Sequence, residues 1–223
     1  MNQHQYHIMR QRLKHLLKQD KHAGPTGEYH IRSLYFDDID NKALHEKLGG
    51  VHDREKFRIR IYNCSDKVIH LEKKIKLNDY VTKVKERLTR DMVESIIAGD
   101  YEVLNVPHKP LLYEMYREMK FKLLRPAVIV DYVREAYVSE WGNVRITFDK
   151  HLKSGMNSFD LFHPNLNTIS AFDIPIMVLE VKYDEYLPEY IRTAIQTEGL
   201  HRQSNSKYVI CRKHIKFNSW EDQ

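Results

Sequence analysis

Alternation of charged and aliphatic side chains is the strongest pattern in this sequence, and it is concentrated in residues 54–88. With a period of two, Arg58 and Arg60 share one face of a predicted strand, while Phe57 and Ile59 share the other. The alternation continues in two further stretches, whose charged positions are Glu72, Lys74, Lys76, Lys83, Lys85 and Arg87. We therefore predict three amphipathic strands with charge on one face and aliphatic side chains on the other.

The rest of the chain alternates between helical and strand patterns. Apolar residues at helical spacing, with capping residues and glycines at the ends, predict helices at 5–19, 41–48, 91–98, 110–122 and 188–196. Branched and aromatic runs predict strands at 29–36, 127–138, 144–150 and 176–183. A polar loop is expected at 153–173, and residues 204–213 fit a helix or a strand. This order favours a single α+β domain over residues 1–223, with mostly antiparallel strands.

The charged strand faces admit two arrangements. They can face water on an open sheet, which is the usual place for charge runs. Alternatively, the helices bury their apolar stripes against the aliphatic strand faces from outside, and the sheet closes into an antiparallel β-barrel with an inward charged face. That lumen would be lined by Arg58, Arg60, Lys74, Lys83, Lys85, Arg134, Arg145 and Lys182, with Glu72 and Glu180 among them.

Composition narrows the class of protein. The chain has 223 residues, 42% hydrophobic and 30% charged, which suits one sizeable domain and is too polar for a membrane protein. No apolar run approaches the ~20 residues of a spanning helix, and a signal-peptide core is missing, so we expect a cytoplasmic protein. Cys64 and Cys211 lack metal spacing and are expected to be reduced. The chain has a net charge of +5, but the window 54–88 alone is more basic than that, so the positive charge is local.

Clustered cations in a low-dielectric lumen require anions, and those anions would be supplied by a ligand. A phosphate chain suits this lumen, because arginine binds phosphate oxygens with two parallel hydrogen bonds and lysine adds a mobile point charge. The inward carboxylates would repel phosphate unless a hard divalent ion bridged them, which favours Mn²⁺ or Mg²⁺.

Seven separated blocks in this order carry a resemblance to a known family: YHIRSLYFDD, REKFRIRIYN, HLEKKIK, VDYVREAY, NVRITFD, VLEVKYDEYLP and SKY. They resemble the VTC-type polyphosphate polymerase domain of the triphosphate tunnel metalloenzymes, also called CYTH-like proteins. The resemblance runs from about Gln5 to Arg212. It implies a tunnel-shaped antiparallel barrel that binds ATP and inorganic polyphosphate.

The resemblance also implies roles for individual residues. The residues that would act on the transferred phosphate are Arg58, Arg60, Lys74, Arg134 and Arg145. Those that would hold the substrate are Lys83, Lys85, Tyr132, Lys182, Ser206 and Lys207. Glu180 matches the family's metal ligand, and the inward-facing Glu72 is the second candidate. Simpler interpretations stay open: Arg134 and Arg145 would pair with Glu135 or Asp149, and Glu180 would neutralise Lys182.

The start of the chain departs from the family pattern. Family members begin with a strand that carries Glu-x-Lys-Tyr, whereas Gln5-Tyr6 here aligns with the helix after that strand. We therefore expect the first strand to be lacking and turnover to be low. Either a strand from a neighbouring copy or another segment fills the gap, or the barrel edges lie open and copies of the chain associate through them.

Three classes of function follow from these residues. The first is a phosphotransferase that moves the γ-phosphate of ATP onto a polyphosphate chain. The second is the same site with water as acceptor, a metal-dependent triphosphatase. The third is a non-catalytic module that binds polyphosphate or triphosphate. Nucleic-acid binding is disfavoured, because the cations alternate along strands instead of interleaving with stacking aromatics on an open face.

Overall fold

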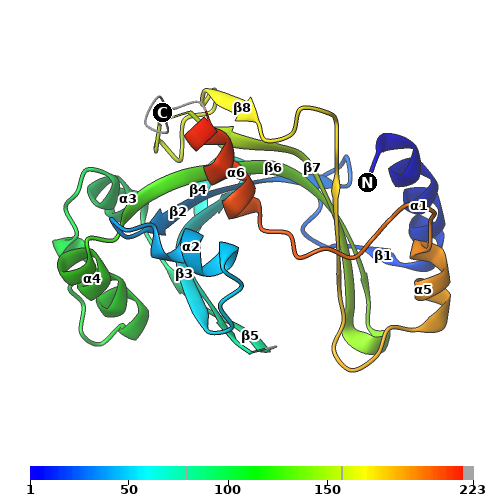
Figure 1. Cartoon of the computed structure of the whole chain (residues 1–223), viewed down its shortest axis with the longest axis horizontal. Coiled ribbons are helices and arrows are strands. Elements are labelled where there is room, and N and C mark those ends of the chain that lie inside the picture. The colour runs from blue at the N-terminus through cyan, green and yellow to red at the C-terminus, as the bar shows by residue number, and fades with distance from the viewer. Residues whose placement is uncertain (79, 157, 218–223) are drawn as a thin grey trace. The chain divides into compact units, whose positions relative to one another are not determined.

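The computed structural model describes residues 1–78, 80–156 and 158–217, and it shows an α+β chain built on an antiparallel sheet (Figure 1). The strands are β1 (Lys18–Gln19), β2 (Glu28–Asp37), β3 (Arg54–Tyr62), β4 (Ser65–Leu77), β5 (Tyr80–Arg87), β6 (Arg125–Ser139), β7 (Val144–Gly155), β8 (Thr168–Ser170) and β9 (Val178–Lys182). The helices are α1 (Gln3–Leu16), α2 (Lys42–Leu48), α3 (Arg90–Ile97), α4 (Pro110–Lys122), α5 (Glu189–Ile195) and α6 (Lys207–Phe217), with short 3₁₀ turns η1 (Glu102–Leu104) and η2 (Trp141–Asn143).

Hydrogen bonds order the strands as β5-β4-β3-β2-β6-β7-β8, with β1 paired to β6 and β9 paired to β7. The predicted α+β class with an antiparallel sheet is confirmed. Among the described residues the strand order ends at β5 and β8, so hydrogen bonds do not close the sheet into a barrel. In the same residues, no helix is both long and apolar enough to cross a membrane.

The chain divides into two compact units. Unit 1 comprises residues 1–30, 132–152 and 172–205. Unit 2 comprises residues 31–131 and 153–171 and the described residues from 206 onward. Strands β2, β6 and β7 contribute residues to both units, and the single domain predicted over 1–223 stays a prediction.

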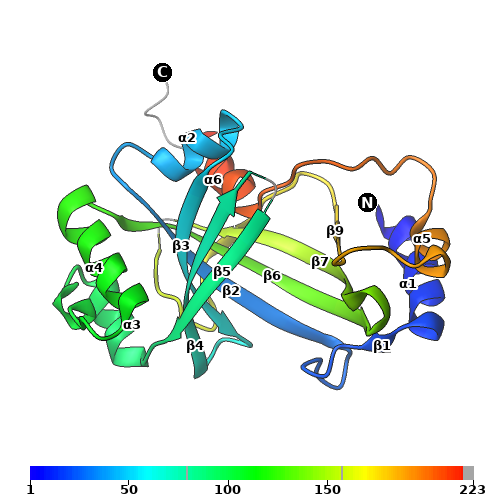
Figure 2. The same ribbon diagram turned by 90° about the horizontal axis from the view of Figure 1, so that it is seen from below.

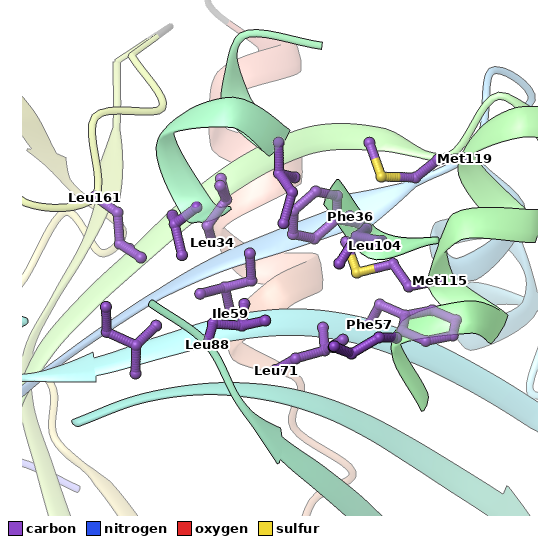
Figure 3. Packing of buried hydrophobic residues seen from close by; sticks show 14 of the residues in the cluster. Leu34, Phe36, Phe57, Ile59, Leu71, Leu88, Leu104, Met115, Met119 and Leu161 are labelled. Carbon is purple, nitrogen blue, oxygen red and sulfur yellow. The ribbon is translucent and has the colours of Figure 1, made fainter. Parts of the chain in front are cut away.

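The core of unit 2 lies on the aliphatic face of the meander β3-β4-β5 (Figure 2). Phe57, Ile59 and Leu71 are at most 3% exposed and pack with side chains of α3 and α4, including Met115 of α4 (Figure 3). Burying each such side chain contributes about 1.5–3 kcal/mol. The predicted division into an aliphatic and a charged face is confirmed for β3 and the middle of β4, whereas β5 has no buried residue.

Unit 1 has its own core, in which α1 and α5 cover the apolar face of β7. Met9 and Leu13 of α1 and Ile191 of α5 are fully buried against Ile146 and Phe148 of β7. The other face of β7 carries the polar side chains of this unit. The helices therefore cover the aliphatic strand face here too, as predicted.

Several predicted boundaries shift for local reasons. Helix α1 ends at Leu16, before residue 19, because Lys18–Gln19 pairs with β6. The ambiguous segment 204–213 forms helix α6 from Lys207 onward. The predicted loop 153–173 contains the end of β7 and all of β8. Both cysteines are free, as expected.

Candidate functional site

One face of β2 to β5 carries the charged side chains of unit 2, and we call it the basic face of unit 2. The strand register brings Tyr35 of β2 opposite Arg58 of β3, and Arg58 opposite Glu72 of β4. The basic face consists of Ser33, Tyr35, Lys56, Arg58, Arg60, Glu72, Lys74, Lys83 and Lys85. Six residues predicted from the sequence are thereby brought together: Arg58, Arg60, Glu72, Lys74, Lys83 and Lys85.

Glu72 is the anion at the centre of the basic face. Its Oε2 accepts a hydrogen bond of 2.8 Å from Arg58 Nε and lies 2.6 Å from Arg58 Nη2, and Lys83 Nζ lies 3.3 Å from its Oε1. Burial alone would raise the pKa of Glu72, but the charges of Arg58, Arg60 and Lys83 lower it to about 2. Some of the cations that were expected to need a bound anion are thus neutralised by a carboxylate of the chain itself.

This arrangement predicts acid sensitivity in unit 2. The pKa of Glu72 falls from 4.5 to about 2 on folding, so its contribution to stability is complete above pH 4.5 and is lost as the pH falls toward 2. The shift corresponds to roughly 3 kcal/mol. Urea unfolding between pH 6 and pH 2 measures it, and Glu72→Gln should flatten this part of the profile. An unchanged profile in that variant would contradict the assignment.

Tyr35 was not predicted as a site residue, yet it touches the central ion pair. Arg58 Nη1 donates a hydrogen bond of 2.7 Å to the Tyr35 hydroxyl oxygen. Burial would raise the pKa of Tyr35, but the charges of Arg58, Lys56 and Arg60 lower it to about 7. A tyrosine in an otherwise apolar run carries no charge signal, so only the register with Arg58 identifies it.

The start of α6 adds two further residues from the predicted set, Ser206 and Lys207. Lys56 Nζ donates to Ser206 Oγ at 3.4 Å, which places Ser206 beside the basic face. The next residue of the helix, Tyr208, donates its hydroxyl hydrogen to Asp37 at the end of β2. Helix α6 is therefore anchored next to the basic face by a buried hydrogen bond.

Unit 1 presents a second charged surface, which we call the polar face of unit 1. It consists of Tyr132, Arg134, Arg145, Thr147, Asp149, Glu180 and Lys182. Arg134 binds Asp149 through two hydrogen bonds of 2.6 and 2.8 Å, lies over the Tyr132 ring at 5.4 Å, and has Glu180 Oε2 at 3.6 Å. The pairing of Arg134 with Asp149 matches one of the simpler interpretations left open by the sequence.

The remaining cations of this face also have acidic neighbours. Arg145 pairs with Asp20, which the sequence had not suggested, and it donates a 3.0 Å hydrogen bond to the Tyr29 hydroxyl oxygen. Lys182 lies 3.2 Å from Glu180 on the same strand. The polar face of unit 1 is therefore closer to charge balance than the basic face of unit 2.

Glu180 is the predicted metal ligand, and both of its carboxylate oxygens have a cation nearby, Lys182 Nζ at 3.2 Å from Oε1 and Arg134 Nη2 at 3.6 Å from Oε2. Its side chain is 36% exposed, and the strand register places it opposite Thr147, whose buried Oγ1 has no hydrogen-bond partner in the described part of the chain. Mg²⁺ is commonly held by one or two carboxylates together with substrate phosphates. Residues 1–78, 80–156 and 158–217 contain no group of three or more His, Cys, Asp or Glu suited to a metal. Glu180 and Thr147 alone would therefore not complete the ligand set of such an ion, and phosphate oxygens would have to supply the rest.

Glu72, the second predicted metal ligand, is more deeply buried than Glu180. Its side chain is 2% exposed, and both of its carboxylate oxygens already face cations, Arg58 and Lys83. A metal ion at Glu72 would have to share these oxygens. The geometry favours Glu72 as the residue that positions Arg58.

The family model of the VTC domain matches residues 1–216. The chain belongs to the VTC domain family. A solved structure from Hippeastrum, described as a putative adenylyl cyclase with a dominant triphosphatase activity, is similar in fold, with a TM-score of 0.54 and 13% identity over 96% of this chain and 92% of that chain. A putative adenylate cyclase from Bacillus halodurans matches with a TM-score of 0.45 and 11% identity over 87% of this chain and 81% of that chain. No curated protein matches the sequence.

Proposed function

We propose that this VTC domain is a metal-dependent phosphotransferase that moves the γ-phosphate of ATP onto a polyphosphate chain. The observation that carries the proposal is the basic face of unit 2, where five lysines and arginines of the predicted set surround one carboxylate. Such a surface suits a ligand with several negative charges. Membership of the VTC domain family supports a function that involves triphosphate or polyphosphate.

Arg58 and Arg60 bind phosphate oxygens in this proposal, and Lys74, Lys83 and Lys85 extend the cationic surface along two further strands. The fork of Arg58 is held by Glu72 and Tyr35, so its orientation is fixed before the substrate binds. Phosphoryl transfer needs little covalent chemistry from the protein, because positioning and charge stabilisation supply most of the acceleration. No residue has to act as a nucleophile.

In unit 1, Arg134, Arg145 and Lys182 contribute cations, with Tyr132 supporting Arg134. Glu180 would hold Mn²⁺ or Mg²⁺, with the Thr147 hydroxyl as a neighbouring oxygen donor. When bound, such an ion would offset the negative charge of the transferred phosphoryl group.

The fold similarity to the Hippeastrum protein favours a second candidate, because a dominant triphosphatase activity is ascribed to that protein. Water would then replace the polyphosphate end as acceptor. A third candidate, a module that binds polyphosphate without turnover, requires only the basic face. Incubation of the purified protein with ATP and Mn²⁺ separates the three: long polymer supports the phosphotransferase, orthophosphate supports the triphosphatase, and binding without product supports the module.

Substitution of Glu180 tests its proposed role as metal ligand. Glu180→Gln should reduce Mn²⁺-dependent turnover by at least about a hundredfold, because the remaining amide is a poor ligand for a hard ion. Tripolyphosphate binding without metal should be unchanged or tighter, since one repulsive charge is removed. Isothermal titration with EDTA present measures the binding. A loss of metal-free binding would instead indicate that Glu180 mainly pairs with Lys182.

A further inference from the structure

Lys56 differs from Arg58 and Lys83, its neighbours on the basic face, in the kind of partner it has. Its Nζ makes a 3.4 Å hydrogen bond to Ser206 Oγ and lies 5.7 Å from the ring centre of Tyr35 and 5.4 Å from that of Tyr208. In the part of the chain that the structure describes, no carboxylate lies within ion-pair distance of this ammonium group. An ammonium group is thus held in a defined place by two rings and one hydroxyl.

The surroundings of Lys56 are strongly positive. Lys74 is its register partner on β4, and Arg58 follows two residues later on the same strand. The single carboxylate of the basic face, Glu72, is already bound to Arg58. Burial, together with the charges of Lys74, Arg58 and Arg54, lowers the pKa of Lys56 to about 8 against the attraction of Tyr35. Around Lys56 the basic face therefore holds three neighbouring cations, Lys56, Lys74 and Arg58, and Glu72 does not pair with Lys56.

We propose that Lys56 and Ser206 form a subsite for one phosphate group of a triphosphate or polyphosphate chain, beside Arg58. The inference rests on the proposed function and adds a residue that neither the charge pattern nor the family blocks had assigned. A phosphate here accepts hydrogen bonds from the ammonium group and from the Ser206 hydroxyl, and it supplies the missing negative charge. The rings of Tyr35 and Tyr208 hold the ammonium group in place, so little side-chain entropy is lost on binding.

Lys56→Met tests the subsite, because methionine keeps an apolar stem against the two rings and removes the charge. In titrations with tripolyphosphate and EDTA at pH 7, Kd should rise about tenfold to a hundredfold, the effect of one lost charge-assisted contact. Lys14→Met, which removes an exposed lysine of α1 in unit 1, is the matched control and should leave Kd unchanged. An equal Kd for Lys56→Met and wild type would overturn the subsite.

A second measurement separates a phosphate contact from a purely structural role. Affinity for tripolyphosphate should fall between pH 7 and pH 9 as Lys56 loses its proton, whereas Lys56→Arg stays charged and should fall less. The groups that face Lys56 from the surrounding elements are Tyr35 of β2, Arg54 and Arg58 of β3, Lys74 of β4, and Ser206 and Tyr208 at the start of α6. Both proteins should carry Tyr35→Phe, because Tyr35 also titrates near this range. Identical pH profiles in the two proteins would overturn the proposal.

The outcomes for the subsite and for the proposed function are distinguishable. If wild type binds tripolyphosphate and turns over ATP while Lys56→Met binds equally well, the subsite is wrong and the proposed function stands. If wild type neither binds tripolyphosphate nor turns over ATP, the proposed function fails, and the subsite fails with it. Thermal unfolding of Lys56→Met should match or exceed that of wild type, since a crowded positive charge has been removed.

Discussion

Arg58→Ala should weaken tripolyphosphate binding by about 1.5–3 kcal/mol and destabilise unit 2 by roughly 3 kcal/mol. Binding falls because the bidentate contact of the Arg58 guanidinium with phosphate is lost. Stability falls because Glu72, which is 2% exposed, loses its principal partner and keeps only weaker contacts with Lys83 and Arg60. Isothermal titration and urea unfolding at pH 7 measure the two effects. If the cations of this face were unpaired, their removal would cost no stability.

The double variant Arg58→Ala with Glu72→Gln separates the two roles of Arg58. Neutralising the buried carboxylate should restore most of the stability, because the uncompensated charge is gone. It should not restore affinity, because glutamine cannot replace the guanidinium. Full affinity in the single variant would contradict the phosphate-binding role of Arg58. Equal stability of Arg58→Ala and wild type would contradict the structural role of its pair with Glu72.

Residue alternation was sufficient to predict the meander β3-β4-β5. One face of β3 and of the middle of β4 is buried, so a shift of register by one residue would move Phe57, Ile59 and Leu71 into solvent, whereas β5 has no buried residue. The pattern therefore determined which side chains share a face, in agreement with the observed register, in which Arg58 lies opposite Glu72 and Glu72 lies opposite Lys85. The sequence blocks that resemble the VTC-type family independently indicated the same charged residues.

Pairing between distant segments could not be predicted in the same way. Alternation identifies the face of a side chain but not the partner that meets it from another strand. Arg145 pairs with Asp20, 125 residues away, and nothing in either local pattern indicates the other. The expectation that the inward cations await a ligand was too simple, because Arg58, Arg134 and Arg145 each have a carboxylate partner within the chain.

Glu135 shows how neighbouring residues on one strand take different roles. A pair between Arg134 and Glu135 was one of the open interpretations, but consecutive side chains of a strand point to opposite faces. Arg134 lies on the polar face of unit 1, whereas Glu135 is fully buried on the other face, toward α1. Its partners Tyr6 and Arg10 come from a helix that the sequence described only by its apolar stripe.

Glu135→Ala should destabilise unit 1 by about 3–5 kcal/mol, the usual cost of removing one partner from a buried charge network. The carboxylate accepts hydrogen bonds of 2.6 Å from Tyr6 and Tyr137 and 2.7 Å from Arg10, and Lys150 Nζ lies at 3.4 Å. All four donors lose an acceptor, and Arg10, whose side chain is 31% exposed, is the donor best placed to bind water instead. Thermal unfolding and urea unfolding measure the loss.

Glu135→Gln is the matched control, since it keeps the volume and one good acceptor oxygen, and it should cost about half as much as the alanine variant. Burial raises the pKa of Glu135, but hydrogen bonds from Tyr137, Tyr6 and Arg10 lower it below the usual value, so its stabilisation is present at neutral pH and is lost on acidification. Because Glu135 ties β6 to α1 next to Arg134, turnover in the glutamine variant should fall while metal-free tripolyphosphate binding by unit 2 is preserved. Equal stability of the alanine variant and wild type would show that the four donors find other partners and that α1 does not depend on Glu135.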